Sequence, residues 1–522
     1  MSPKGRPKGE SGPKRVSAEG SPVSGANNRV YDLLIVGGGV NGAGVARDAA
    51  GRGLATLLVE QDDLAAATSQ WSTKLIHGGL RYLEHYEFRL VAESLAEREV
   101  LLAQAPHLIE PLSFVLPHEP HLRPAWMIRA GLFLYDRIGG RMSLPRSFTV
   151  DLAASRWGAG LRRNFRTGFV YADARVDDAR LVVATAVAAR GKGAEIRTRT
   201  RLDGAVREGG AWRARLSGPG GTTDEVRAKA IVNVGGPWVA KVLASVSSAP
   251  TDASVRHVKG SHIVVPRVHA EEHAYLLQNA DKRIVFVIPY QGQYTLIGTT
   301  DVPVTDYEHP AISERETDYL LELANTYLER PLARSDVVWA FSGVRPLYDD
   351  GKSDPSSITR DYVLKLDAGA GGAEPPVLSI YGGKLTTYRK LAEAALAALK
   401  PHFPAMGGPW TERDTLPGGD LPGRDRKAWV ADLGRRYPGL PAALLDACCR
   451  RHGARAAAVL GDAKTPADLG RDFGHGLTER EVDWFVREEW AHSADDILWR
   501  RTKAGLGMDA AGRDALAAHV GA

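Results

Sequence analysis

The sequence has little of what several classes of protein depend on, and each shortage excludes a class. Among 522 residues there are only two cysteines, Cys448 and Cys449, and they are neighbours. Adjacent residues make a poor disulfide, and two thiols cannot ligate an iron–sulfur cluster, so we expect a protein of a reducing compartment. No run of 18 apolar residues occurs, so no segment is predicted to span a membrane.

A large excess of charge of one sign is also absent. Lysine and arginine total 67 against 62 aspartate and glutamate, a formal net charge of +5. Such a mild excess suits an anionic substrate or an anionic membrane surface and does not indicate nucleic acid. The first 29 residues lack the apolar core of a secretory signal and are rich in Pro, Gly, Ser and Lys. We interpret residues 1–29 as a disordered basic tail.

The secondary-structure pattern of the rest of the chain changes once. Strand-like and helix-like runs alternate over residues 30–404, and three β-rich runs between Ser261 and Asp301 suit an antiparallel sheet. The stretch PHFPAMGGPW then interrupts the pattern with proline and glycine, and the remainder is mainly helical in pattern. We therefore expect an α/β catalytic region over 30–404 and a helical C-terminal domain over 405–522.

A glycine motif follows the first predicted strand. In YDLLIVGGGVNGAGVARDAAGRGLATLLVE, Gly37, Gly39 and Gly42 fit G-x-G-x-x-G between an apolar strand and a helix. These glycines permit a sharp turn, close approach of a pyrophosphate and close helix–strand packing, respectively. The next strand delivers Glu60, 21 positions after Gly39, where an acid would hold a ribose hydroxyl. The unit predicts a bound dinucleotide, NAD or FAD.

Two features favour FAD over NAD. No second G-x-G-x-x-G follows a strand, so a single dinucleotide would exchange hydride with a small substrate. The segment AIVNVGGPW is similar to the later strand-and-glycine segment of flavoproteins, which would bring Gly235 back to the same nucleotide. A plain loop is the alternative interpretation of Gly235.

Longer blocks carry a specific resemblance. The stretch TSQWSTKLIHGGLRYLEHYEFRLVAESLAEREVL, with KGSHIVVP, IGTTD, SGVRPL, ITRDY and GGKLTTYRKLAE, closely resembles the bacterial, aerobic, FAD-dependent sn-glycerol-3-phosphate dehydrogenases. The resemblance runs from Tyr31 to about Lys503. It implies an FAD-binding Rossmann-like domain interleaved with an α+β substrate (cap) domain of the glycine/amino-acid-oxidase kind, plus an all-helical C-terminal domain. It also implies oxidation of sn-glycerol 3-phosphate to dihydroxyacetone phosphate, with electrons passed through FAD to membrane quinone.

A phosphorylated substrate calls for fixed cations, and arginine offers a planar fork of donors. The resemblance implies a substrate pocket lined by Arg81, Tyr82, Arg345, Arg360 and Lys384. A surface salt bridge is the alternative for any one of the cations taken alone.

The alcohol of the substrate must lose its proton as hydride leaves. We predict His262, in KGSHIVVP, as the general base. A histidine satisfied in a core is the alternative, and Arg345 would then act by stabilising a developing alkoxide.

The loop after Glu60 is dense in polar side chains, and the resemblance implies that it wraps the pyrophosphate and the flavin ring. An N-cap cluster before a helix over residues 81–101 is the alternative, and His77 invites a covalent flavin linkage that the resemblance disfavours. No metal is predicted. The predicted FAD contacts are Gly37, Gly39, Val40, Asn41, Gly42, Glu60, Thr68, Ser69, Ser72, Lys74, His77, Gly79, Gly235, Lys384, Leu385 and Thr386.

A membrane-bound quinone requires contact with the bilayer. Residues 121–146 mix aromatic and aliphatic side chains with arginines, which predicts peripheral binding to the anionic inner face of the cell membrane. A core helix bordered by arginines is the alternative. A cytoplasmic location follows, and a homodimer is left open. Three other functions remain: an oxidase using O2, an amino-acid-oxidase-like flavoenzyme and a non-catalytic FAD-binding membrane scaffold.

Overall fold

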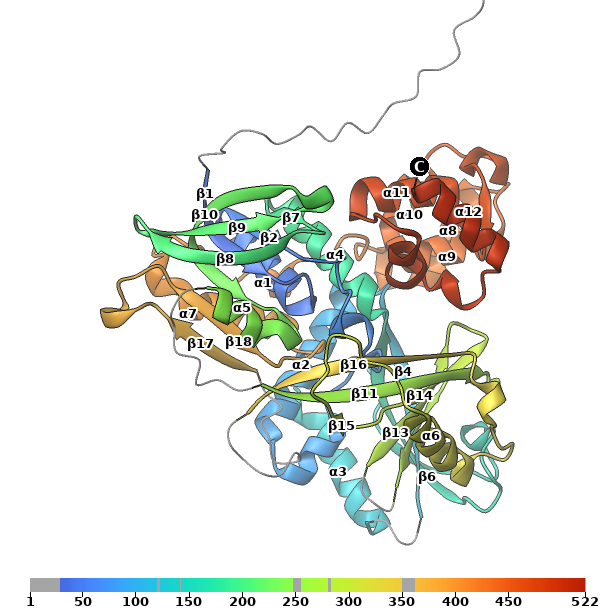
Figure 1. Ribbon diagram of the computed structural model, residues 1–522. Helices are drawn as coiled ribbons and strands as arrows, with labels where there is room; N and C mark the ends of the chain where they lie inside the picture. The colour runs from blue at the N-terminus through green and yellow to red at the C-terminus, as the bar shows by residue number, and fades with distance from the viewer. Residues whose placement is uncertain are drawn as a thin grey trace, which may run out of the picture.

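The computed structural model describes residues 29–119, 123–140, 142–246, 255–279, 283–349 and 362–521. Residues 1–28 of the predicted tail, and also Arg141 and Arg360, lie outside the described residues. The described chain forms two sheets, one above the other in Figure 1, and a C-terminal group of helices beside the upper sheet.

The first sheet contains the glycine motif and has a parallel centre. Its order is β17-β18-β10-β1-β2-β7, with β9 paired to β10 and β8 to β9. Strand β1 pairs in parallel with both β2 and β10, so the strand order reverses at β1. The strands are β1 (Val30–Val36), β2 (Thr56–Val59), β7 (Glu195–Arg197), β8 (Arg201–Glu208), β9 (Ala211–Ser217), β10 (Thr223–Asn233), β17 (Val363–Asp367) and β18 (Val377–Tyr381).

Both faces of this sheet are covered, which explains why β1 is apolar on both sides. Leu33 and Ile35 face α1, α4 and α7, whereas Leu34 and Val36 face β8, β9 and α5. Gly44 lets α1 approach α7, because a Cβ there would lie 2.8 Å from the Tyr388 ring. The helices are α1 (Val40–Gly51), α4 (Asp178–Gly191), α5 (Val239–Ser245) and α7 (Tyr388–Leu399).

The second sheet is larger and mainly antiparallel. Its order is β15-β11-β14-β13-β12-β4-β6-β3, with β16 paired to β11 and β5 to β6. The predicted antiparallel runs are β11, β14 and β13, which are neighbours in that order. The strands are β3 (Leu75–Ile76), β4 (Ile109–Pro117), β5 (Phe148–Asp151), β6 (Thr167–Val176), β11 (Val255–Pro266), β12 (Ala274–Gln278), β13 (Ile284–Tyr290), β14 (Tyr294–Gly298), β15 (Val302–Pro303) and β16 (Trp339–Tyr348).

Helices cover this sheet too. Helix α6 (Glu314–Tyr327) packs on one face, and α2 (Phe88–Gln104) and α3 (Ala125–Ile138) pack with the apolar residues of the other. The chain visits the second sheet at β3–β6, returns to the first at β7–β10, and repeats this exchange once more. The predicted interleaving of the two parts is therefore confirmed.

The C-terminal region is helical, as predicted, but it also contains a small hairpin of β19 (Asp472–Gly474) and β20 (Leu477–Thr478). Two small apolar cores of its own hold it together. Both cysteines are buried there as free thiols. Its helices are α8 (Arg426–Arg436), α9 (Ala442–His452), α10 (Ala456–Leu460), α11 (Glu479–Glu489) and α12 (Ala510–Val520).

One predicted helix begins later than expected. The helix anticipated over residues 81–101 starts at Phe88, after a 3₁₀ turn from Leu80 to His85. Tyr86 separates the two because its φ of +58° is left-handed and ends the turn. Within the described part of the chain, none of the helices combines the length and the apolar composition needed to cross a bilayer.

Candidate cofactor and substrate site

A cavity of about 1340 Å³ lies between the two sheets. It opens at the carboxyl ends of β1, β2 and β10, where the strand order reverses, and extends to β11 and β16 of the second sheet. Ligands of open α/β sheets bind at such a reversal. Sixteen of the predicted site residues line it: Gly37, Gly39, Val40, Asn41, Glu60, Thr68, Ser69, Ser72, His77, Arg81, Tyr82, Gly235, His262, Arg345, Lys384 and Leu385.

The glycine turn is built so that no side chain fits. Gly37 has a φ of +121°, and a Cβ there would lie 2.5 Å from the Val234 carbonyl oxygen. A Cβ on Gly42 would lie 1.9 Å from the Gly37 carbonyl oxygen. Gly42 does not line the cavity but lets α1 start against the turn, and Gly39 is the N-cap of α1 at the cavity wall. The N-terminus of α1 therefore faces the cavity with its positive dipole end.

Glu60 is held rigidly at the end of β2. Its Oε2 accepts a hydrogen bond from the Gly38 N–H at 2.6 Å, and its Oε1 accepts one from the Asp62 N–H at 2.9 Å. Burial raises the pKa of this carboxyl to about 7, and the two backbone donors oppose that rise. A carboxylate fixed in this way has lone pairs left to accept ribose hydroxyls.

The polar loop after Glu60 is tied both to the cavity and to the scaffold. The Val40 N–H donates to Ser69 Oγ at 3.0 Å, which attaches the loop to the start of α1. Thr68 Oγ1 donates to the Val344 carbonyl at 2.6 Å, and Ser72 Oγ donates to Asp178 at 2.7 Å. The hydroxyls therefore position the loop as well as lining the cavity.

Three predicted FAD contacts near this loop lie behind the cavity wall. Lys74 is 5% exposed, and its ammonium donates to Asp178 and to the Gln70 carbonyl at 2.8 Å each. Thr386 Oγ1 accepts the His77 N–H at 3.2 Å. Gly79, with a φ of +75°, leaves room for the Tyr82 ring, 2.3 Å from where its Cβ would be. The Lys74 N–H also donates to Ser72 Oγ at 2.9 Å, so each of the three supports a residue that does line the cavity.

Lys384 presents an unpaired cation to the cavity. Its Nζ is buried and has no hydrogen-bond partner among the described residues, and it lies 4.2 Å from the centre of the Tyr82 ring. The nearby Asn41 Oδ1 is buried and unpaired as well, while Asn41 Nδ2 donates to the Gly382 carbonyl. Nearly all buried polar groups are paired, so these two atoms indicate a polar ligand that offers an anionic or carbonyl acceptor to Lys384 and an N–H or O–H donor to Asn41.

His262 lies on β11 at the cavity and is 2% exposed. Its Nε2 lies 3.1 Å from Thr73 Oγ1, and its ring stacks on Phe341 with centroids 4.8 Å apart. Burial, followed by the nearby cations Lys74 and Arg345, lowers the pKa of His262 to about 3. The imidazole is therefore neutral at physiological pH.

Arg345 lies on β16 and lines the same cavity as His262. Its Nη2 donates to Asp301 Oδ1 at 2.7 Å and to the Thr300 carbonyl at 3.2 Å. Gly260 makes room for the guanidinium, because a Cβ there would lie 2.9 Å from Nη2. Arg81 also lines the cavity, whereas Arg360 lies outside the described residues.

Several residues that line the cavity were not predicted from the sequence. Trp71, Thr73 and Asp301 line the cavity, and all three lie inside blocks that carried the resemblance. Arg256 and Arg283 also line it but lie outside those blocks, so no local signal marks them. The sheet register brings Arg256 to the cavity, since β11 pairs with β16 along its length.

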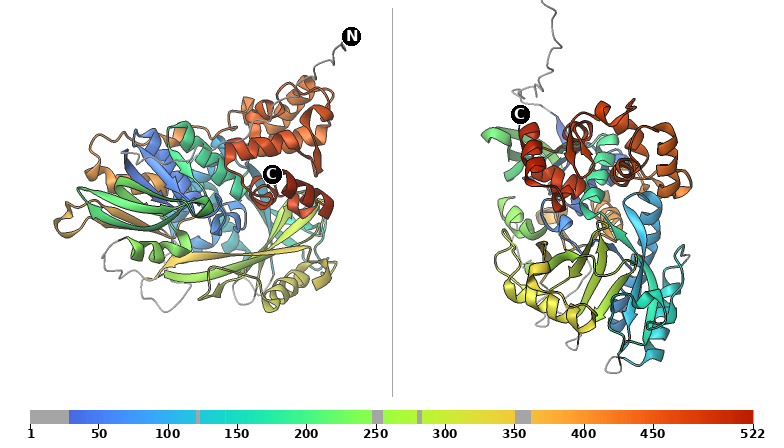
Figure 2. Two further views of the ribbon diagram at one scale, coloured as in Figure 1. Left: turned by 45° about the horizontal axis from the view of Figure 1, so that its top comes forward. Right: turned by 90° about the vertical axis from the view of Figure 1, so that its right-hand side faces the viewer.

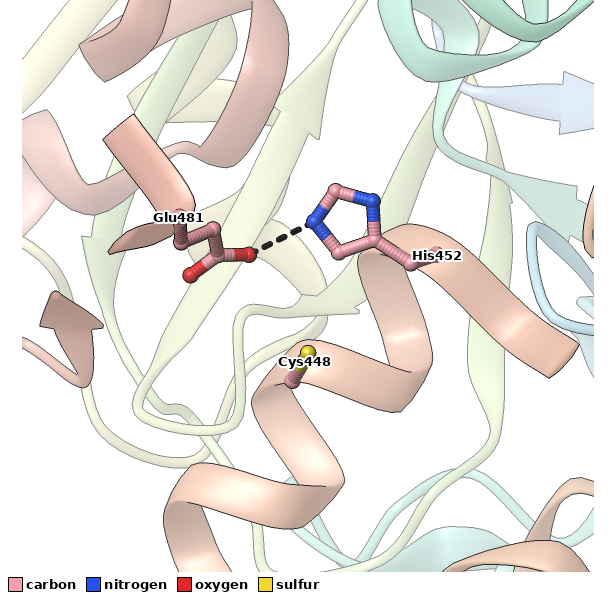
Figure 3. A group of neighbouring side chains, drawn as sticks. All are labelled: Cys448, His452 and Glu481. Atoms are coloured by element: carbon pink, nitrogen blue, oxygen red, sulfur yellow. Dashed lines mark hydrogen bonds and ion pairs between the residues drawn. The ribbon is translucent and has the colours of Figure 1, made fainter. Parts of the chain in front are cut away.

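A second group of potential ligands lies in the C-terminal region, away from the cavity. Cys448, His452 and Glu481 are buried together (Figure 3). His452 Nε2 lies 2.8 Å from Glu481 Oε1, and Arg451 contacts both carboxylate oxygens at 2.6 Å. The charge of Glu481 is therefore balanced by Arg451 within the protein.

The fold and the cavity define the class: this chain belongs to the FAD-dependent oxidoreductases. The family described as FAD dependent oxidoreductase matches residues 32–389. The family described as the C-terminal domain of alpha-glycerophosphate oxidase matches residues 410–521.

Curated relatives narrow the class further. The chain is 53% identical over 478 residues to glycerol-3-phosphate dehydrogenase of Pseudomonas aeruginosa, covering 91% of this chain and 92% of the relative. It is 52% identical over 481 residues to aerobic glycerol-3-phosphate dehydrogenase of Escherichia coli, covering 92% and 95%. It is also 51% identical over 492 residues to D-erythritol 1-phosphate dehydrogenase of Brucella abortus, covering 94% and 97%.

Solved structures agree with this placement. Glycerol-3-phosphate dehydrogenase from Bacillus halodurans, complexed with FAD, has a TM-score of 0.71 at 26% identity, covering 92% of this chain and 87% of that one. Glycine oxidase from Bacillus cereus shares the fold, with a TM-score of 0.53 at 18% identity, covering 72% and 98%. The resemblance seen in the sequence and the predicted fold class are confirmed.

The residues at the cavity fit FAD, the cofactor of this family. The glycine turn and the N-terminus of α1 suit the pyrophosphate, and Glu60 suits a ribose. At the other end, the unpaired Nζ of Lys384 suits a carbonyl of the flavin ring or an anionic group of the substrate beside it.

Proposed function

We propose that this protein oxidises sn-glycerol 3-phosphate to dihydroxyacetone phosphate and passes the electrons to a membrane quinone. The observation that carries the proposal is the buried ammonium of Lys384, which has no hydrogen-bond partner among the described residues and lies in the same cavity as the neutral imidazole of His262. The names of the relatives support the choice of a phosphorylated polyol.

The side chains divide the work between binding and proton transfer. Arg81, Arg345 and Lys384 supply cations for the phosphate dianion, and Asp301 holds Arg345 in its orientation. When the Thr73 hydroxyl accepts the Nε2–H of His262, Nδ1 carries the lone pair; Nδ1 has no hydrogen-bond partner among the described residues and can take the proton of the C2 hydroxyl. FAD, when bound, supplies the hydride acceptor.

Anaerobic titration of the purified holoprotein tests the reaction. We expect glycerol 3-phosphate to bleach the oxidised flavin band, and glycine to leave it unchanged. Bleaching by glycine would favour an amino-acid oxidase, and bleaching by neither compound would favour a non-catalytic scaffold. D-erythritol 1-phosphate is the third compound to be tested, because the relative named for it is nearly as similar to this chain as the other two relatives are. Faster reduction by D-erythritol 1-phosphate would overturn the assignment of substrate while keeping the class.

The acceptor is tested after reduction. We expect the bleached flavin to be reoxidised quickly by a soluble quinone analogue and slowly by O2. Rapid reoxidation in air with formation of hydrogen peroxide would identify an oxidase instead.

We also propose that α3 contacts the anionic inner face of the cell membrane. This helix exposes apolar side chains that a protein core would bury: Trp126 is 70% exposed and Phe133 is 53% exposed. Tyr86, at the end of the 3₁₀ turn that precedes α2 and contacts α3, is 79% exposed. Helix α3 lies at the end of the molecule opposite the C-terminal helices (Figure 1), so this end can meet a bilayer while the C-terminal helices stay in solution.

The arginines of α3 do not all serve this surface. Arg129 donates to the hydroxyl and the carbonyl of Ser147, which makes it part of the scaffold. Arg137 lies over the Phe133 ring at 3.5 Å and extends the apolar surface with a charge that suits lipid headgroups.

Sedimentation with anionic phospholipid vesicles tests this surface. We expect Trp126→Ser combined with Phe133→Ser to lower the bound fraction several-fold, because the exposed apolar area is lost. The matched control is Val206→Ser with Val486→Ser, which removes similarly exposed apolar side chains elsewhere. Equal vesicle binding by both double variants would show that α3 is not the membrane contact.

A further inference from the structure

A short segment of the C-terminal domain contacts both sheets. Residues Asp496–Thr502, labelled η13, form a π-helical turn that packs against α4. Its Trp499 stacks on Trp339 of β16, with ring centroids 4.7 Å apart and an angle of 14°. In Figure 2 the C-terminal helices lie beside α4, which covers the first sheet.

Two arginines of this turn contact the loop after β2, next to the predicted cofactor site. Arg501 is fully buried, and its Nη1 and Nη2 donate to the two carboxylate oxygens of Asp63 at 2.7 and 2.8 Å. Arg500 Nε donates to Asp63 Oδ2 at 2.5 Å. Asp63 is itself fully buried, so two cations of the C-terminal domain hold a single carboxylate in the loop after β2.

The loop that carries Asp63 also carries the ribose acid. Glu60 lies three residues earlier and receives the Gly38 N–H, and the Ala65 N–H donates to the Gly38 carbonyl at 3.0 Å. The loop is thus hydrogen-bonded to the glycine turn through residues on either side of Asp63 in the sequence. It continues directly to Ser69, which binds the first turn of α1.

A second chain of hydrogen bonds leads from η13 to Glu60. Asp496 accepts hydrogen bonds from Arg199 Nη2 at 2.7 and 2.9 Å, and it also binds Arg500. The Arg199 N–H donates to the Asp62 carbonyl, and the next residue, Thr200, donates its N–H to the Glu60 carbonyl at 2.7 Å. Both sets of contacts begin in η13 and hold the loop that contains Glu60, the first through the Asp63 carboxylate and the second through the backbone of Asp62 and Glu60.

We propose that Arg501, assisted by Arg500, is a positioning residue for the cofactor: it fixes Asp63 and thereby the loop that holds Glu60 and the glycine turn against the adenosine half of FAD. The C-terminal domain therefore sets how tightly FAD is retained, although none of its residues lines the described cavity. This inference rests on FAD binding at the proposed site. It requires no contact between Arg501 and the cofactor.

The test compares Arg501→Lys with a matched control in the same domain. Lysine keeps the charge but loses the planar fork that grips both oxygens of Asp63. The control is Arg451→Lys, because Arg451 makes an equally close two-oxygen contact with Glu481 and does not touch the loop after β2. Each holoenzyme is diluted into buffer without FAD, and the released FAD is measured by absorbance after ultrafiltration.

We expect Arg501→Lys to release FAD at least tenfold faster than the wild type, with an unchanged KM for glycerol 3-phosphate when FAD is in excess. Arg451→Lys should release FAD at the wild-type rate even if it melts at a lower temperature. Arg500→Gln is the milder variant, since that side chain is 12% exposed, and it should shift the release rate in the same direction.

The outcomes distinguish failure of the positioning role of Arg501 from failure of the FAD assignment. Equal release rates for Arg501→Lys, Arg500→Gln and Arg451→Lys would overturn the positioning role. Faster release by all three would also overturn it, because the effect would then reflect general loosening of the C-terminal domain. A wild-type protein that holds no FAD would instead contradict the cofactor assignment itself.

Discussion

Single residues at the cavity carry out different roles because their surroundings differ. His262 and His77 both line it, yet Thr73 and Phe341 hold the ring of His262, while His77 is tied through its backbone to Thr386. Burial lowers the pKa of both histidines. The residue types were evident from the sequence, but the neighbours that set their protonation come from distant strands.

Replacing the predicted base separates proton transfer from binding. We expect His262→Asn to lower kcat by about 10²-fold or more, because general-base catalysis typically contributes that much, and to leave KM within about threefold. The pKa near 3 also means that the wild-type kcat should show no acid limb from His262 above pH 5. The control is His269→Asn, a half-buried histidine outside the cavity, which should keep kcat. A kcat of wild-type size in His262→Asn would assign the base elsewhere.

Removing the unpaired cation should weaken binding without costing stability. We expect Lys384→Met to raise KM for glycerol 3-phosphate by about 10- to 100-fold, since a hydrogen bond to a charged group contributes about 1.5–3 kcal/mol. Its melting temperature should hold or rise, because the variant removes a buried group with no partner among the described residues. Lys390→Met, which removes a surface partner of Glu393, is the control for loss of charge. Steady-state kinetics and thermal melts measure both effects, and an unchanged KM would remove Lys384 from substrate binding.

At the scale of elements, local patterns predicted the centre of the first sheet correctly. The apolar strand, glycine turn and helix of the motif are β1, the turn and α1, the next strand is β2, and AIVNVGGPW contains the end of β10 and the turn after it. The predicted start of α2 was wrong by seven residues, because the left-handed backbone at Tyr86 ends the preceding turn. Helix propensity alone does not reveal such a break, since the apolar spacing continues across it.

The glycine turn offers a test of an element as a unit. We expect Gly42→Ala to lose bound FAD and stability together, because the added Cβ would lie 1.9 Å from the Gly37 carbonyl and push α1 off the turn. Gly191→Ala, near the end of α4 with open space around it, should be neutral or stabilising by about 0.5–1 kcal/mol. Flavin content and urea unfolding are the measurements. FAD retained by Gly42→Ala would contradict the packing argument.

At the scale of the whole molecule, burial of neutral histidines makes stability depend on pH. Burial lowers the pKa of His107 and His273 to about 3 and that of His269 to about 4, as it does for His262. The unfolded chain then binds more protons below about pH 6.5, so stability is full above that value and falls as the pH drops. Glu60 opposes this trend, because its raised pKa favours the folded state at low pH.

We expect the histidines to outweigh Glu60, so that the urea midpoint of the holoprotein falls between pH 7.5 and pH 5.5. Each such histidine contributes a slope of at most about 1.4 kcal/mol per pH unit. His107→Asn should make the dependence shallower, since it removes one of these groups from the buried set. A midpoint that rises on acidification would show that the buried carboxyls dominate.

By itself the sequence determined the glycine turn with its acid, the class of cofactor, the order of the main elements and the family, because these depend on residues close together in the chain. Only the tertiary structure decided which polar groups face the cavity. It placed Lys74 behind the wall with Asp178, left Lys384 Nζ without a hydrogen-bond partner in the described part of the chain, and brought Arg501 to Asp63 across 438 positions of sequence. Such pairings follow from sheet order and domain packing, and these are set by the sum of many long-range contacts rather than by any local pattern.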